Sequence, residues 1–90
     1  MALQIERSSH FKRDYKRMKK QGADLSKLLE VIRKLAAEER LDRHYLDHEL
    51  KGNWRGYREC HLEPDWLLIY RIEEDTLRLG RTGSHSDLFG

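Results

Sequence analysis

The period of the apolar residues changes once along this chain, and this change limits the folds open to it. Phe11, Tyr15 and Met18 are spaced i, i+4 and i+7, and residues 25–36 continue a helical pattern. From residue 54 onward, the apolar residues follow the period of a β-strand instead. The two periods belong to different backbone geometries. Helices followed by successive strands predict an α+β fold.

The first third of the chain is predicted to hold a short strand and a helix hairpin. The strand covers residues 3–7, where apolar and polar residues alternate. Ser8 and Ser9 are candidate N-caps for the first helix, and Gly22 is suited to end it. Asp24 can cap the second helix. Two amphipathic helices joined by so short a turn predict a helix hairpin.

The second half is predicted to form three antiparallel strands, covering residues 55–62, 66–72 and 76–82. Residues 63–65 form the first turn, where a proline fixes φ. The middle segment is almost continuously apolar, as expected of a central strand that is covered on both faces. With the N-terminal strand, we expect an antiparallel sheet of about four strands with the helix hairpin packed on one face. Residues 1–90 are predicted to form this single domain.

Basic residues are concentrated at the start of the chain. Residues 1–34 hold ten Lys and Arg against four Asp and Glu, whereas residues 35–90 hold eight against twelve. Such a basic region is typical of a surface that binds nucleic acid or an acidic protein, although a solvated helix face has the same composition. The candidate RNA-binding residues, all in the first predicted helix, are Lys12, Lys16, Arg17, Lys19 and Lys20.

Size and cysteine content exclude several classes of protein. A chain of 90 residues has no room for a dinucleotide-binding domain beside a substrate domain. Cys60 is the only cysteine, which excludes an intramolecular disulfide and a cysteine-based zinc site, and its place in a strand indicates a small buried residue. No apolar signal segment opens the chain, and no stretch approaches the roughly 18 apolar residues of a membrane span. We therefore expect a cytoplasmic protein that does not contact membranes.

Imidazole, carboxylate and guanidinium groups gather in the C-terminal third, at His61, Asp65, Arg81 and His85. Each has an ordinary explanation when taken singly, but together in a small basic chain they favour acid–base chemistry on RNA. In RNA transesterification the 2′-OH loses a proton and the leaving 5′-oxygen gains one, and imidazole or carboxylate can serve both steps. A guanidinium stabilises the charge that develops on the phosphate. This chemistry requires no metal and no cofactor.

Strand alternation predicts where these groups face. Glu59 and His61 share one face of their strand, which we interpret as the open face of the sheet, opposite the helices. Simple alternation places Arg81 on the same face of its strand as Leu77 and Leu79, which is the core side. Two alternatives remain: Gly80 forms a β-bulge that turns Arg81 to the other face, or Arg81 lies beyond the edge of the core.

Two other interpretations use the same residues differently. His44 and His48 are spaced i, i+4 and would share a helix face as metal ligands, but residues 38–53 show no helical period. The chain is alternatively a non-catalytic module that binds RNA or protein through its basic helices, with the histidines incidental. The length of the irregular segment itself hints at a function.

Three segments of the second half resemble the YafQ branch of the RelE-type bacterial toxins. They are HELKGNWRGYR from His48, HLEPDW from His61 and RTGSHSDLFG from Arg81, whereas the first half agrees only in its layout of a strand and a basic helix hairpin. The resemblance implies a microbial-ribonuclease-like fold and a ribosome-dependent endoribonuclease that cuts mRNA in the ribosomal A site. It also implies a cognate antitoxin that silences the enzyme, and a basic helical surface that grips ribosomal RNA.

The resemblance also implies six site residues. They are His48, His61, Asp65, Arg81, His85 and Phe89. The three histidines and the aspartate match the family's acid–base residues, the arginine matches the one that supports the scissile phosphate, and the phenylalanine matches a terminal aromatic that positions the mRNA. Trp66 matches a residue flanking the site, where a structural role is equally expected. Glu59 departs from the family, in which an aspartate can occupy this position, so its part in the site is open.

Overall fold

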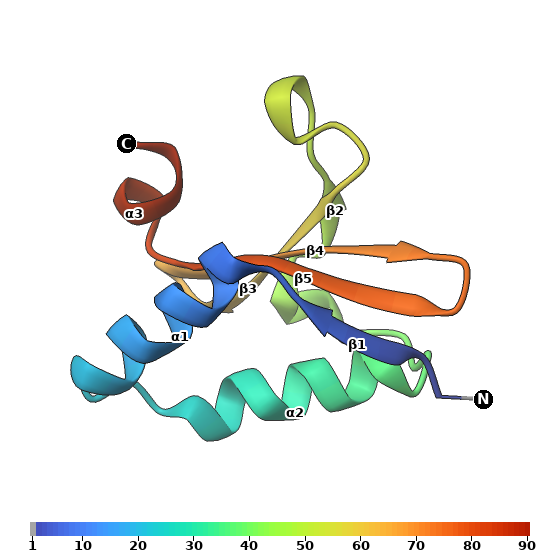
Figure 1. The fold of residues 1–90 in the computed structure, drawn as a ribbon, viewed down its shortest axis with the longest axis horizontal. Coiled ribbons are helices and arrows are strands. Elements are labelled where there is room, and N and C mark those ends of the chain that lie inside the picture. Colours follow the sequence, from blue (N-terminus) through green and yellow to red (C-terminus); the bar gives the residue numbers. More distant parts are fainter. Residues whose placement is uncertain (1) are drawn as a thin grey trace.

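The computed structural model describes residues 2–90 as a sheet with helices on one face and shorter elements on the other (Figure 1). The elements in chain order are β1 Gln4–Arg7, α1 Ser9–Lys20, α2 Leu25–Ala36, β2 His48–Glu49, β3 Arg58–Glu63, β4 Trp66–Glu73, β5 Thr76–Gly83 and α3 His85–Phe89, with single 3-10 turns η1 Arg43–Tyr45 and η2 Gly52–Trp54. The sheet order is β1-β5-β4-β3-β2. This is the predicted α+β class, with five strands in place of about four.

Side-chain caps begin both long helices where the sequence predicts them. Ser8 is the N-cap of α1, since its hydroxyl accepts a hydrogen bond of 2.9 Å from the backbone N–H of Phe11. Asp24 caps α2 by accepting from the backbone N–H of Ser26 at 3.1 Å. Gly22 has a φ of 80°, the left-handed conformation that lets the chain turn between the helices.

The sheet is antiparallel except at one strand. Strands β3, β4 and β5 form the predicted meander, and β2 adds a two-residue antiparallel edge to β3. β1 lies parallel to β5, with Gln4 opposite Thr76, so the expectation of an antiparallel sheet fails there. The helices and the meander carry the chain from one strand to the other, and a long connection of this kind is what parallel pairing requires.

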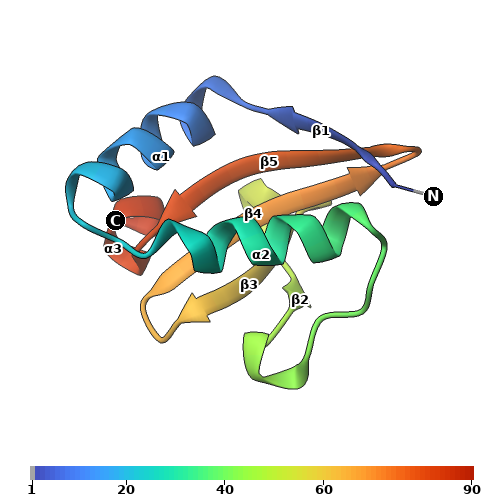
Figure 2. The ribbon, with the colours of Figure 1, turned by 90° about the horizontal axis from the view of Figure 1, so that it is seen from below.

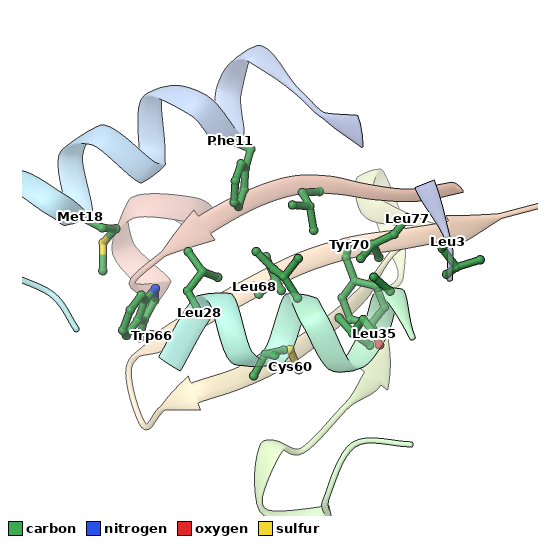
Figure 3. Close-up of a cluster of buried hydrophobic side chains, with 14 residues drawn as sticks. Leu3, Phe11, Met18, Leu28, Leu35, Cys60, Trp66, Leu68, Tyr70 and Leu77 are labelled. Atoms are coloured by element: carbon green, nitrogen blue, oxygen red, sulfur yellow. The ribbon is translucent and has the colours of Figure 1, made fainter. Parts of the chain in front are cut away.

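The core lies between the sheet and the helix hairpin. Figure 2 shows α2 crossing the sheet, and Figure 3 shows side chains from both layers meeting between them. The largest contributions come from Phe11, Met18, Leu28, Leu35, Cys60, Leu68, Tyr70, Leu77 and Leu79. Each fully buried leucine or phenylalanine stabilises the fold by about 1.5–3 kcal/mol. Cys60 is completely buried, as predicted, and burial raises the pKa of its thiol to about 12.

The second face of β4 is also covered. Leu67 and Ile69 are fully buried on this face against Leu88 of α3, with Trp54 and Tyr57 packed beside them. The central strand is therefore buried on both sides, as its continuous apolar sequence predicts. Within residues 2–90, every helix is too short or too polar to cross a lipid bilayer.

A β-bulge at Gly80 sets the direction of Arg81. Ile69 pairs with Arg81 and Tyr70 pairs with Leu79, which leaves Gly80 as an extra residue in β5. A Cβ atom at position 80 would lie 3.2 Å from the ring of Tyr57 and 3.3 Å from the carbonyl oxygen of Ile69, so a larger residue would require these neighbours to move by a few tenths of an ångström. Arg81 consequently shares the face of Ile69, opposite the helices. Of the alternatives that the sequence left open, the bulge is the one found.

Candidate active site

Three histidines from separate elements meet on the sheet face that the long helices leave uncovered. His48 comes from β2, His61 from β3 and His85 from the first turn of α3. The rings of His48 and His61 are stacked with centroids 6.2 Å apart, and those of His61 and His85 lie 5.8 Å apart. In Figure 1, α3 and the β2–η2 segment rise on this side of the sheet. The fold thus brings three residues together although the outer two, His48 and His85, are 37 positions apart in the sequence.

Glu59 lies between two of the histidines. Its Oε1 atom is 3.8 Å from Nε2 of His48 and 3.6 Å from Nε2 of His61, which is ion-pair range when either ring is protonated. The side chain of Glu59 is only 7% exposed. The predicted face for Glu59 and His61 is confirmed, but this face is less open than expected because α3 and the β2–η2 segment cover part of it.

Asp65 holds His85 in a defined orientation. Its Oδ1 atom accepts a hydrogen bond of 2.9 Å from the backbone N–H of His85 and one of 2.7 Å from ring Nδ1. A proton on Nδ1 leaves Nε2 of the neutral ring free to accept one. The two hydrogen bonds, the backbone one first, lower the pKa of the Asp65 carboxyl. The pair is therefore arranged for proton transfer at Nε2 of His85.

A capping box fixes the short helix that carries His85. The Ser84 hydroxyl accepts from the backbone N–H of Asp87, and Asp87 accepts in return from the backbone N–H of Ser84, both at 3.1 Å. Leu88 then points into the fold, whereas Phe89 is 48% exposed. This helix was not predicted, although the spacing of Ser84 and Asp87 is a signal for it.

His48 is held in place by its neighbours in the chain. Its ring Nδ1 donates a hydrogen bond of 2.7 Å to the carbonyl oxygen of Leu46. Asp47 anchors the same segment to β3 and β4, accepting from Nε of Arg58 at 2.8 Å and from the hydroxyl of Tyr70. The segment before β2 is thus tied to the body although it has no regular secondary structure beyond one turn.

Arg81 reaches the same face two strands away from His61. Its side chain is 22% exposed, and its Nε and Nη2 atoms both donate to the carboxylate of Asp14 at 2.9 Å. The remaining nitrogen, Nη1, is the part of the guanidinium that Asp14 does not engage. The candidate site thus combines two carboxylates among the histidines with one cation two strands away, on β5.

Several residues singled out from the sequence lie elsewhere. Trp66 belongs to the helix-side core, where its Nε1 atom donates to the hydroxyl of Thr82 at 2.9 Å, so its role is structural. His44 belongs to η1 and His48 to β2, so the two residues do not share a helix face and the alternative i, i+4 metal pair is not formed. The ring of His44 instead lies 3.1 Å from Asp42. Phe89 sits on α3 beside the cluster without being part of it.

A different set of side chains has the geometry of a metal site. One donor atom from each of Glu59, His61 and His85 lies within 4.8 Å of the others. Imidazole and carboxylate together suit zinc, copper or nickel. The same atoms are the ones available for proton transfer, so metal binding and acid–base chemistry would compete for them.

The predicted RNA-binding surface is exposed apart from one residue. Lys12, Lys16, Lys19 and Lys20 lie on the solvent side of α1. Arg17 is instead tied into the fold, donating to Asp14 at 2.8 Å and to the carbonyl oxygen of Thr82 at 3.1 Å. Four lysines therefore form the basic surface of α1, and Arg17 serves the packing of that helix.

The sequence model for the bacterial toxin of type II toxin–antitoxin systems, YafQ, matches residues 3–90. The chain belongs to the YafQ toxin family. The mRNA interferase toxin YafQ of Escherichia coli K12 is 42% identical over 87 residues, which cover 96% of this chain and 95% of that protein. The resemblance seen in the second half of the sequence therefore extends over nearly the whole chain.

Solved structures of YafQ-family and related toxins share the fold. The E. coli DinJ–YafQ toxin–antitoxin complex contains a chain that is 41% identical to this one and superimposes on it with a TM-score of 0.92. The match covers 100% of each of these two chains. A metal-bound toxin from Helicobacter pylori is 50% identical, with a TM-score of 0.90 over 97% of this chain and 99% of that one. The α+β arrangement of sheet and helices is thus the arrangement of this family.

Proposed function

We propose that this YafQ-family chain is an mRNA interferase, a ribosome-dependent endoribonuclease that cleaves mRNA in the ribosomal A site, inhibits translation in the cytoplasm and is neutralised by a cognate antitoxin. The carrying observation is the cluster of His48, His61 and His85 with the Asp65–His85 pair, on the same sheet face as Arg81. The names of the E. coli relatives, an mRNA interferase toxin and a complex with the antitoxin DinJ, support the reaction and the partner.

The proposed reaction needs two proton transfers at one phosphate. As the 2′-oxygen attacks phosphorus, its proton passes to one imidazole, and as the bond from phosphorus to the 5′-oxygen breaks, a second imidazole donates a proton to that oxygen. The products are a 2′,3′-cyclic phosphate and a 5′-hydroxyl. Each such transfer accelerates the reaction by roughly 10²–10⁴-fold. His85, oriented by Asp65, is one of the two groups, and His48 or His61, beside Glu59, is the other.

Arg81 and Phe89 act on the substrate rather than on protons. The guanidinium lies on the strand next but one to His61, where it stabilises the negative charge that develops on the phosphate oxygens. Phe89 is exposed at the end of α3 and offers a surface on which a splayed base can stack. The lysines of α1 provide the charge for binding ribosomal RNA, which positions the message.

The proposed mechanism uses no metal, because imidazoles carry out both proton transfers. A metal held by Glu59, His61 and His85 would occupy these imidazoles. We therefore expect protein that has been treated with EDTA and dialysed to cleave on ribosomes in magnesium buffer as fast as untreated protein, and added zinc or copper to inhibit it. Loss of cleavage by the treated protein that zinc or copper restores would replace this mechanism with a metal-dependent one.

The central test measures cleavage of message on programmed ribosomes by the purified chain and by His85→Ala and Asp65→Ala. Both variants should lose most of the activity while remaining folded, and their expression should no longer arrest growth. Glu63→Gln, at the end of β3 two residues before Asp65, is the matched control and should cleave normally. Full cleavage by the two site variants would contradict the proposal.

The alternative is a non-catalytic module that acts through the exposed lysines of α1. Charge reversal at Lys16, Lys19 and Lys20 would then abolish growth arrest, whereas His85→Ala would leave it intact. Under the proposed function, charge reversal weakens ribosome binding and makes the remaining binding less dependent on salt, because fewer phosphate contacts are left, and the histidine variant is inactive at every salt concentration.

A further inference from the structure

Asp14 is a buried acid at the edge of the site. It belongs to α1 and lies on the apolar stripe of that helix, between Phe11 and Met18. Its residue exposure is 1%, and its carboxylate accepts four hydrogen bonds. The donors are Nε of Arg81 at 2.9 Å, Nη2 of Arg81 at 2.9 Å, Nη1 of Arg17 at 2.8 Å and the backbone N–H of Thr82 at 3.2 Å.

We propose that Asp14 is a positioning residue for RNA cleavage, which holds the guanidinium of Arg81 in the orientation that stabilises the scissile phosphate. This inference rests on the proposed function. It assigns a role in the reaction to a helix residue that makes no contact with the histidine cluster.

Hydrogen bonds to Asp14 fix the orientation of the Arg81 guanidinium. Two parallel hydrogen bonds to one carboxylate set the plane and the direction of the Arg81 fork. The third anchor, the backbone N–H of Thr82, ties the carboxylate to the same strand that carries Arg81. A free arginine side chain loses rotamer entropy on binding, and this arrangement removes that freedom before the substrate arrives.

Two guanidiniums, those of Arg17 and Arg81, share the carboxylate of Asp14. With Asp87 as the second carboxylate, the cluster holds two cations and two anions. Arg17 also lies 3.4 Å from Asp87, which belongs to the capping box of α3. The same carboxylate that orients the phosphate-binding group is therefore connected to the helix that carries His85.

Burial raises the pKa of Asp14, but hydrogen bonds from Arg81 and Arg17 outweigh it, so the pKa lies below its usual value. Asp14 is thus ionised at neutral pH. A buried charge of this kind is a poor means of adding stability, because apolar residues of similar volume serve as well or better. β1 pairs with β5 only as far as Leu79, so the backbone N–H of Thr82 has no partner strand on that side and needs a side-chain acceptor. An asparagine at position 14 would also supply one. The full charge is needed only for Arg81 and Arg17.

The test is a double-mutant cycle between Asp14→Asn and Arg81→Ala, measured as single-turnover cleavage on programmed ribosomes. Asparagine keeps an acceptor for Thr82 but offers only one oxygen to Arg81. We expect Asp14→Asn alone to lower the maximal rate by roughly 10–100-fold, as a misplaced catalytic group does, with ribosome affinity unchanged. In the Arg81→Ala background the same substitution should have no further effect. Asp24→Asn, at the N-cap of α2 and without contact to Arg81, is the matched control and should cleave normally.

Two results would overturn the proposal: a wild-type rate for Asp14→Asn, or equal losses from Asp14→Asn with and without Arg81. If Asp14→Asn does not fold, Asp14→Glu takes its place in the cycle, since it keeps the charge and displaces it by one methylene. Nitrogen NMR of the unsubstituted protein gives an independent readout, in which the Nε–H of Arg81 should exchange slowly, and rapid exchange would overturn the proposal. Absence of cleavage by the unsubstituted chain would instead refute the proposed function.

Discussion

The two faces of the meander are built from alternate residues of the same three strands, yet they have opposite chemistry. Toward the helices, the strands present apolar side chains, with Cys60, Leu68 and Leu79 among them. On the other face, Glu59 and His61 lie beside a small apolar floor. The first face stabilises the fold by removing apolar surface from water, and the second carries buried polar groups at a cost to stability. Neighbouring positions should therefore respond to substitution in opposite ways.

The largest effect is expected at His61 on the site face. His61→Ala should lower the cleavage rate by roughly 10²–10⁴-fold, the usual contribution of an acid–base group. Its ring Nδ1 is buried without a hydrogen-bond partner among residues 2–90, so removing the ring should not lower the free energy of unfolding. Cleavage assays and urea unfolding on the same preparation measure both effects. A large loss of stability would show that His61 belongs functionally to the core.

The next effect is expected on the helix-side face at Leu68, which is fully buried. Leu68→Ala should lower the free energy of unfolding by about 2–5 kcal/mol, because it removes buried methyl groups and leaves a cavity. The cleavage rate per folded molecule should remain that of wild type. If the rate falls in the folded fraction, the two faces are not independent.

A smaller effect is expected from the cap of α3, which joins the two kinds of structure. Ser84→Ala removes the hydroxyl that accepts from Asp87 and should cost about 1 kcal/mol. The loss should be confined to α3, so the amide of Leu88 should exchange faster with solvent while amides of β4 are unaffected. Uniformly faster exchange would mean that α3 unfolds only with the whole domain.

The smallest effect concerns acid stability at the exposed Asp65. Hydrogen bonds from His85 hold its pKa in the folded chain below the usual value of 3.8. The group therefore adds stability above about pH 4, and this contribution is lost as the pH falls through the lowered value. Urea midpoints at pH 7, 4 and 3 should show Asp65→Asn below wild type at pH 7 and converging with it in acid. A gap that widens in acid would contradict this sign.

The helices, the meander and the polar face of β3 could be predicted because each depends on a repeating local pattern. The two-residue strand β2 and the parallel direction of β1 could not, since both depend on pairing partners that are distant in the sequence. The helix α3 was missed even though Ser84 and Asp87 signalled it. Long elements with many repeats are predictable, whereas short ones are fixed by the body around them.

The site was predictable in its chemistry but not in its geometry. Residue types indicated His61, Asp65 and His85 as site residues. The contact between Asp65 and His85 could not be predicted, because it depends on how two segments 20 positions apart are placed in the fold. Glu59 could be assigned a face but not its place between two imidazoles. Asp14 was not singled out in the sequence, because its proposed role depends on Arg81, 67 positions away.

The bulge at Gly80 divides β5 into two segments whose inward and outward positions are counted independently. Upstream, odd-numbered residues such as Leu79 face the helices, and downstream the even-numbered Thr82 does. A deletion of residue 80 would therefore be more damaging than any substitution there, because it would turn Arg81 into the apolar layer and Thr82 out of it. Insertions and deletions at this one position therefore decide which face of the sheet carries Arg81, the residue proposed to bind the phosphate.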